Sequence, residues 1–278
     1  MKKVASEFHI DSLRQNPAGY QTRFSEYGPN YIVSNFGQNY FGQVKFRISF
    51  KFDLKTNTQT NKFYFALTQN VFWDLYKQSS PMREYDFLPT LFYEHRLNKS
   101  FSMGDWWLRL NNYTINYLHA SNGQAGPDNR SLYKLIGSSD IEMIRKKPEQ
   151  IKFTLAEMAF TVKAWIWNMV DQENHNIADY QGYAQLVSTF RFDYGVKNQY
   201  RPYQLEINDV FTPAKTGITN ELNLKVNPFI GHANYDWIPY LFVQYFHGYG
   251  EGLLNYDNRN TNYRPQNLFR LGIEFRVF

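Results

Sequence analysis

The chain has 278 residues, a formal net charge of +5, 43% apolar and 20% charged residues, and no cysteine. This composition excludes a disordered chain, and the lack of thiols excludes disulfides, iron–sulfur clusters and cysteine nucleophiles. No apolar run reaches the roughly 18 residues that a membrane-spanning helix needs. The unusual feature is an aromatic content of 19% in a chain whose mean hydropathy is −0.58.

The amino-terminal residues contain no secretion signal. Lys2, Lys3, Glu7 and Asp11 interrupt the first twelve residues, which lack the apolar core of roughly 7 to 15 residues that a signal peptide carries. We therefore expect a signal peptide to be absent from this chain, and residue 1 not to be the start of the natural precursor. We assign residues 1–29 to an N-terminal extension and residues 30–278 to one domain.

From residue 30 onward, apolar and polar residues alternate with a period of two. In residues 44–54, for example, Phe46, Ile48 and Phe50 alternate with Arg47 and charged neighbours, which is typical of a strand with one apolar and one charged face. Turn-forming residues separate such segments. We predict twelve strands at residues 30–35, 43–55, 62–74, 87–97, 105–121, 131–144, 151–167, 180–194, 199–208, 218–226, 235–249 and 266–278.

Two of these segments change phase in the middle. In 105–121 the apolar series that ends at Leu110 restarts at Tyr113, and in 151–167 the series that ends at Leu155 restarts at Met158. A β-bulge in each strand restores one continuous face.

Alternation alone does not say which face points inward, so a soluble barrel or sandwich remains an alternative. The even number of strands, most of which approach or exceed the roughly 9 to 11 residues of a tilted membrane strand, favours a membrane barrel. A terminal strand that ends at Phe278 also supports it. Tyrosine and tryptophan gather near strand ends, as interfacial girdles require, at Trp73, Tyr76, Trp106, Trp107, Trp165, Trp167, Tyr235 and Trp237. We predict an all-β protein, a twelve-stranded antiparallel transmembrane β-barrel.

The basic residues alternate along strands and do not cluster. We therefore expect no nucleic-acid partner, and we expect Lys45, Arg47 and Lys51 to pair with acidic residues inside a filled barrel or to serve lipopolysaccharide phosphates. The spacing of His95, His175, His232 and His247 does not indicate a metal site.

A candidate catalytic pair lies at the end of the predicted strand 105–121. His119 and Ser121 are two residues apart, so their side chains share one face, and the chain then turns at Asn122-Gly123. A serine hydroxyl needs an adjacent base to become a nucleophile. The glycine that follows leaves a backbone N–H unobstructed, which is a candidate oxyanion donor.

Three blocks of sequence resemble the outer-membrane phospholipase A family. Residues 119–123 read His-Ala-Ser-Asn-Gly and precede Asn129-Arg130-Ser131, similar to the family pattern H-x-S-N-G followed by S-R-S-x-N. Residues 244–256 resemble Q-x-x-x-G-Y-G-E-x-L-x-x-Y, and residues 79–84 resemble S-S-P-F-R-E. Together with Val44-Lys45-Phe46, which is similar to the family's V-K-F strand, these matches cover nearly the whole chain.

The resemblance implies calcium-dependent hydrolysis of phospholipid acyl esters, as phospholipase A1 and A2, in the outer membrane of a Gram-negative bacterium. It implies a site on the outer barrel wall that becomes active when two barrels form a homodimer. Ser121 would be the nucleophile, His119 the base, and Gly123 the oxyanion donor. Calcium would bind the main-chain oxygen of Gln124, the Asn129 side chain where the family has serine, and the main-chain oxygen of Ser79 from the partner barrel.

Two further positions matter to this interpretation. The family's asparagine that orients the histidine is replaced by Tyr133, so reduced activity, or an inactive homologue, stays open, as does a channel without enzymatic activity. Asn122 or Asn129 could take over the orienting role. Gln69 interrupts the apolar face of the strand 62–74, where the family places a polar residue that bonds its counterpart across the dimer.

Overall fold

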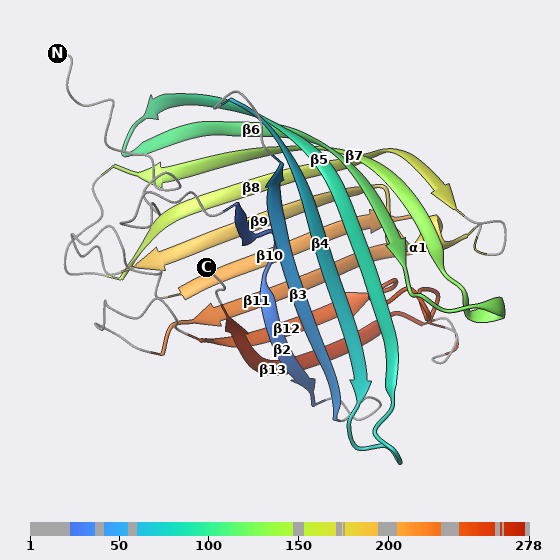
Figure 1. Cartoon of the computed structure of the whole chain (residues 1–278). Coiled ribbons are helices and arrows are strands. Elements are labelled where there is room, and N and C mark those ends of the chain that lie inside the picture. The colour runs from blue at the N-terminus through green and yellow to red at the C-terminus, as the bar shows by residue number, and fades with distance from the viewer. Residues whose placement is uncertain are drawn as a thin grey trace.

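The computed structural model describes residues 23–36, 42–54, 60–146, 153–170, 174, 176–193, 205–228, 239–258, 262 and 264–275. These residues form one antiparallel sheet that closes on itself as a barrel of tilted strands (Figure 1). The strands are β1 (Phe24–Glu26), β2 (Asn30–Asn35), β3 (Gln43–Leu54), β4 (Asn61–Asp74), β5 (Met82–Met103), β6 (Trp106–Ser121), β7 (Ser131–Arg145), β8 (Thr154–Val170), β9 (Ala184–Asp193), β10 (Leu205–Ala214), β11 (Gly217–Val226), β12 (Tyr240–Gly248) and β13 (Gln266–Phe275).

The barrel has twelve strands because β1 and β2 together make up the first one. Both pair with the same edge of β3, whose other edge is occupied by β4. Glu26 pairs with Phe50 and Tyr31 pairs with Arg47. Residues 26–31 of the first strand therefore lie opposite the shorter segment 47–50 of β3. Pro29 lies in this interruption. The sheet therefore includes β1, which falls in the segment that the sequence assigned to an N-terminal extension.

The side chains alternate between an apolar outer face and a polar lumen, as the prediction of a transmembrane barrel requires. Large apolar residues such as Phe65, Leu91 and Ile115 are exposed on the outside. Charged and amide side chains such as Lys45, Arg270 and Gln244 are buried inside, as the polar lumen of a membrane barrel allows. No helix in the described parts of the chain is long and apolar enough to cross a membrane.

Both predicted bulges are confirmed. The β6 ladders shift register between Leu110 and Asn112, and the β8–β9 ladder shifts between Leu155 and Glu157. Each shift lies where the apolar series changes phase. Apolar alternation thus predicted the local irregularity as well as the strand.

Three sequence-based assignments need correction. Part of the predicted strand 180–194 belongs to a short helix, α1 (Ile177–Gln181), because Gly182 ends it at φ +78° before β9 begins. The strand predicted at 199–208 continues beyond residue 208, since β10 extends to Ala214, which pairs with Gly217 in the β10–β11 hairpin. Trp165 faces the lumen, where Lys134 Nζ lies 5.0 Å from its ring centroid, so it is not part of an outer girdle. The predicted girdle residues Tyr235 and Trp237 lie outside the described residues.

A row of ion pairs crosses the lumen wall near the end of the barrel where β8 begins and β13 ends. Arg191 contacts Glu157 and Glu206, and Lys225 lies 2.9 Å from both Glu206 and Glu274. Alternating charges on β8, β9, β10, β11 and β13 neutralise one another in a region that is shielded from bulk water. Pairing of this kind offsets part of the cost of burying the charges.

Candidate active site

His119 and Ser121 lie on the outer face at the end of β6, as predicted. Tyr113, Ile115 and Tyr117 precede them on the same face and are all exposed. Ala120, which lies between His119 and Ser121, is buried toward the lumen. The strand alternation therefore presents an imidazole and a hydroxyl side by side at the rim of the apolar outer surface.

Asn122 organises the loop that follows. Its N–H donates to the Arg130 carbonyl at 3.1 Å, and its side-chain oxygen accepts from the N–H groups of Gln124 (3.3 Å) and Arg130 (3.0 Å). Its amide nitrogen donates to the carbonyl of Asp128 at 2.8 Å. Because Asn122 is only 1% exposed and its side chain is used in these bonds, it does not orient His119.

Gly123 directs a backbone N–H to the serine. Its φ is +64°, a conformation that favours glycine, and its N–H donates to Ser121 Oγ at 3.2 Å. Nothing outside the adjacent residues lies within 4 Å of the place where a Cβ would stand, so the chain is uncrowded at this glycine. The N–H lies next to the serine hydroxyl, and its role as an oxyanion donor stays a prediction.

His119 contacts a ring and not a hydrogen-bond acceptor. It is directly opposite Tyr133 in the β6–β7 ladder, and the two ring centroids are 4.5 Å apart at 33°. Nδ1 of His119 is buried and has no hydrogen-bond partner among the described residues. Nor does any hydrogen bond link His119 with Ser121 in this part of the chain. The structure therefore brings Tyr133 to the imidazole, but as a packing partner.

The residues expected to bind calcium lie in two loops at this end of the barrel. Gln124 and Asn129 belong to the β6–β7 loop, which contains a 3-10 turn, η1 (Gly126–Asp128), and Ser79 belongs to the β4–β5 loop. Among the described residues no hydrogen bond ends on the Gln124 carbonyl or the Asn129 side-chain oxygen, and no cluster of three acidic or histidine side chains forms a metal site. Hard carbonyl and amide oxygens suit calcium, so the oxygens present fit this ion.

The β4–β5 loop contains two consecutive residues in the left-handed backbone conformation. Ser79 and Ser80 both have positive φ, at 64° and 41°. The Ser80 carbonyl accepts a hydrogen bond from the Trp73 indole at 2.8 Å, and its hydroxyl donates to the Leu75 carbonyl at 2.7 Å. These bonds hold the turn, and within the described residues they leave the Ser79 carbonyl unused.

Gln69 lies on the outer face of β4 between Ile48 and Phe87. Both neighbours are exposed, at 50% and 42%, and no hydrogen bond of Gln69 occurs within the described residues. A lone amide in an apolar surface is costly in hydrocarbon unless it finds a partner.

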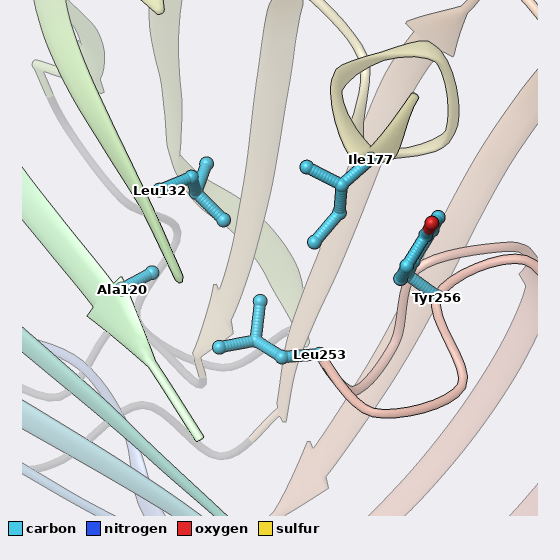
Figure 2. Close-up of a cluster of buried hydrophobic side chains, with 5 residues drawn as sticks. All are labelled: Ala120, Leu132, Ile177, Leu253 and Tyr256. Carbon is cyan, nitrogen blue, oxygen red and sulfur yellow. The ribbon is translucent and has the colours of Figure 1, made fainter. Parts of the chain in front are cut away.

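The wall behind the site is supported from inside the barrel. Ala120 of β6 and Leu132 of β7 pack with Ile177 of α1 and with Leu253 and Tyr256 of the β12–β13 loop, and Figure 2 shows these side chains pointing toward one another. Leu253 and Tyr256 belong to the block 244–256 that resembles the family, but local sequence pattern does not predict this contact. Ile177 carried no signal, since it stands in a short helix that alternation did not predict.

Charged groups hold the β12–β13 loop in the lumen. Backbone N–H groups of Leu253 and Leu254 donate to Asp86 and Glu84 of β5. Glu251 accepts from Lys45 Nζ at 3.0 Å and from Arg270 Nη2 at 2.8 Å. Burial raises the pKa of Glu251, but the positive charges of Arg270 and Lys45 outweigh it and lower this pKa to about 2. The expected pairing of Lys45 with an acidic residue is confirmed.

A closed antiparallel barrel with an apolar outer face defines an outer-membrane β-barrel, here with an imidazole and a hydroxyl on its outer wall. The phospholipase A1 family model matches residues 20–264. The chain belongs to the phospholipase A1 family.

Several known proteins are similar to this chain. A putative phospholipase A1 of Neisseria meningitidis is 26% identical over 244 residues, which are 83% of this chain and 55% of that protein. Phospholipase A1 of Proteus vulgaris is 26% identical over 223 residues, 79% of this chain and 66% of its own length. This chain therefore spans less than two thirds of the length of either relative.

Solved structures show the same fold. Outer membrane phospholipase A from Escherichia coli superposes with a TM-score of 0.63 at 23% identity, covering 91% of both chains. The Salmonella typhi outer membrane phospholipase, a dimer with bound calcium, gives 0.64 at 22% identity, again over 91% of both. The fold class of a twelve-stranded barrel is thereby confirmed.

Proposed function

We propose that this protein hydrolyses acyl ester bonds of phospholipids in the outer membrane of a Gram-negative bacterium, next to lipopolysaccharide. The observation that carries the proposal is the placement of His119 and Ser121 on the outer face, with the Gly123 N–H directed at Ser121 Oγ. Family membership supports the substrate class. A nucleophile on the outer wall is accessible to lipid and has no use in a channel.

In the proposed mechanism, Ser121 Oγ attacks the acyl carbonyl carbon while His119 takes the hydroxyl proton. The carbonyl oxygen becomes an oxyanion that accepts a hydrogen bond from the Gly123 N–H. Collapse of the intermediate releases the lysophospholipid, to which His119 returns the proton, and leaves an acyl group on Ser121. Water activated by His119 then frees the fatty acid. Attack at the sn-1 or the sn-2 ester gives A1 or A2 activity.

The oxygens of Gln124 and Asn129, with Ser79 of the partner subunit, would hold calcium. Such a cation supplies positive charge that stabilises developing negative charge. The chain's contribution is to present these oxygens. Asn122 braces the β6–β7 loop, while the turn at Ser79 leaves its carbonyl available for the other barrel.

The proposed homodimer would pair Gln69 with its counterpart. The amide lies among exposed apolar side chains and has no hydrogen bond within the described residues, so a second copy would supply the missing partner. The same association would bring Ser79 to the site of the neighbouring barrel.

Two alternative functions are a conducting channel and a homologue with impaired activity. A conducting channel is disfavoured, because the β12–β13 loop is anchored within the lumen through Glu251. An impaired homologue is favoured by one observation, the buried Nδ1 of His119 without a partner among the described residues. We expect an enzyme with a lower rate than one whose histidine is held by a hydrogen bond.

Fatty-acid release from phospholipid in mixed detergent micelles tests the proposal. With added calcium we expect release, with a calcium chelator none, and with Ser121→Ala a fall of roughly a thousandfold or more. Ser139→Ala is the matched control, since this serine lies on β7 away from the site and donates to the Asn112 carbonyl. Equal rates of the wild type and Ser121→Ala would rule out the assignment of the nucleophile.

A further inference from the structure

Three rings lie close together on the outer wall beside the site. Tyr133 of β7 neighbours both His119 and Tyr117 of β6, with centroid distances of 4.5 Å to His119 and 6.0 Å to Tyr117. The planes of Tyr133 and Tyr117 differ by only 20°, so these two rings are stacked. The distance to His119 is the shortest between ring centroids in the described part of the chain. Such pairs stabilise beyond simple burial and restrict how a ring can turn.

Strand geometry fixes this arrangement. His119 and Tyr133 are direct neighbours across the β6–β7 ladder, and Tyr117 is the diagonal neighbour, opposite Leu135. Cross-strand neighbours on one face lie within reach of aromatic side chains. Tyr133 therefore has two aromatic neighbours on β6, His119 and Tyr117, and contact with both restricts how its ring can turn.

No hydrogen bond within the described residues performs the orienting task instead. Nδ1 of His119 is buried without a partner there, and the side chain of Asn122 is engaged in its own loop. The ring contact with Tyr133 is therefore what restrains the imidazole plane among the residues described.

We propose that Tyr133 is a positioning residue that holds His119 by ring packing, in place of a hydrogen-bond acceptor. The inference rests on the proposed function, in which His119 is the base. Packing fixes the plane of the imidazole but does not select which nitrogen carries the proton. Under this proposal the ring of Tyr133 positions His119, and its hydroxyl plays no part; a side chain with neither a ring nor an acceptor would leave the imidazole unrestrained.

Two substitutions separate the ring from the hydroxyl. Tyr133→Phe keeps the ring, so we expect kcat and KM close to those of the wild type. Tyr133→Leu keeps an apolar side chain but removes the ring, and we expect kcat to fall by about a hundredfold with KM unchanged, because a base displaced by a fraction of an ångström transfers protons poorly.

The chain offers a matched control for the loss of a stacked tyrosine. Tyr113 also faces outward on β6 and stacks on a histidine, His95, with centroids 4.9 Å apart at 28°. Tyr113→Leu removes the same chemical group from the same face away from the site, and kcat should not change. If kcat of Tyr113→Leu fell as far as that of Tyr133→Leu, the effect would come from any loss of an aromatic side chain from the outer wall. That result would overturn the proposal.

A measurement independent of turnover observes the stack directly. In 13C-histidine-labelled protein in micelles, the His119 ring protons, assigned by their loss in His119→Gln, should be shielded by the neighbouring ring. We expect this shielding in the wild type and in Tyr133→Phe, and its loss in Tyr133→Leu.

The outcomes distinguish the inference from the proposed function. Absence of fatty-acid release by the wild type with calcium would overturn the proposed function, while the ring shielding would still decide whether Tyr133 holds His119. Unshielded His119 protons in the wild type would overturn the inference. So would a Tyr133→Leu variant with unchanged kcat, or a Tyr133→Phe variant as slow as Tyr133→Leu.

Discussion

Replacing Glu251 by glutamine should loosen the loop that fills the barrel. This carboxylate is the shared partner of Lys45 and Arg270, and the exposed fractions of the three side chains are 7%, 5% and 0%. Glutamine keeps the size and one acceptor oxygen but removes the carboxylate charge that directly contacts two buried cations. Removing one member of a buried ion pair costs more than the pair contributes, since the remaining charges are stranded.

Two independent estimates give the size of the effect. A pKa of about 2 for Glu251, against an ordinary value of 4.5, corresponds to roughly 3 kcal/mol of folding free energy. Removing one partner of a buried ion pair lowers the free energy of unfolding by about 3 to 5 kcal/mol. We therefore expect the free energy of unfolding of Glu251→Gln to be about 3 kcal/mol lower than that of the wild type.

An exposed ion pair at the same end of the barrel provides the control. Asp179 of α1 lies 3.0 Å from Lys215, and the side chains are 38% and 75% exposed. Asp179→Asn should cost less than about 1 kcal/mol because solvent screens this pair. Urea titration in micelles, followed by the shift in gel mobility between folded and unfolded barrel, measures both variants. Equal midpoints for Glu251→Gln and Asp179→Asn would refute the assignment of the loop anchor.

The contacts of Glu251 with Lys45 and Arg270 also predict that stability depends on pH. Because the folded state lowers the pKa of Glu251, its contribution is complete above about pH 5 and is lost as the pH falls toward 2. The wild type should therefore lose its advantage over Glu251→Gln in this window. A difference between the two proteins that stays constant from pH 7 to pH 2 would contradict this linkage.

Three further substitutions test other parts of the structure. Gly252→Ala should destabilise the barrel by about 1 to 3 kcal/mol in the urea assay, because a Cβ there would lie 2.6 Å from buried Glu84 Oε2. Tyr133→Asn should raise fatty-acid release by about tenfold, because an amide oxygen could accept from His119 and select its tautomer as well as its orientation. Gln69→Leu should weaken dimerisation by about 1 kcal/mol in cross-linking or sedimentation experiments with calcium.

Each of these has a control or a contrary result. Gly137→Ala adds a methyl group that meets only Ile166, at 3.3 Å, and this side chain is exposed and can move, so its midpoint should not change. Equal rates for Tyr133→Asn and the wild type would show that another group sets the tautomer of His119. An unchanged dimer in Gln69→Leu would place the interface on another face.

Sequence periodicity predicted most of the wall because a strand with one face in lipid and one in a polar lumen must alternate. The bulges near Leu110 and Leu155 were visible for the same reason, as was the outward direction of His119 and Ser121. Alternation from Ser121 also implied that Asn122 turns inward, away from the imidazole, but the sequence analysis kept it as an orienting candidate.

Other features could not follow from local pattern. Glu251 and Lys45 are 206 positions apart, and the N–H of Leu254 reaches Glu84 across 170 positions. Such contacts depend on how the closed barrel brings its loops together. The ring contact between Tyr133 and His119 was missed for a different reason. At the level of sequence, Tyr133 only replaces an asparagine acceptor, whereas the ladder register makes its ring a packing partner of His119.

The place where the barrel closes has a consequence for how the protein could be opened. Within the described residues β2 meets β13 over six residue pairs, and Gly272 lies so close to β2 that a Cβ there would stand 1.9 Å from the Ile32 carbonyl oxygen. β6 and β7 lie on the far side of the cylinder, several strands from this seam in either direction (Figure 1). Opening of the barrel between β2 and β13 would leave the β6–β7 hairpin, which carries His119 and Ser121, paired on both sides. The site could therefore keep its geometry while this seam opens.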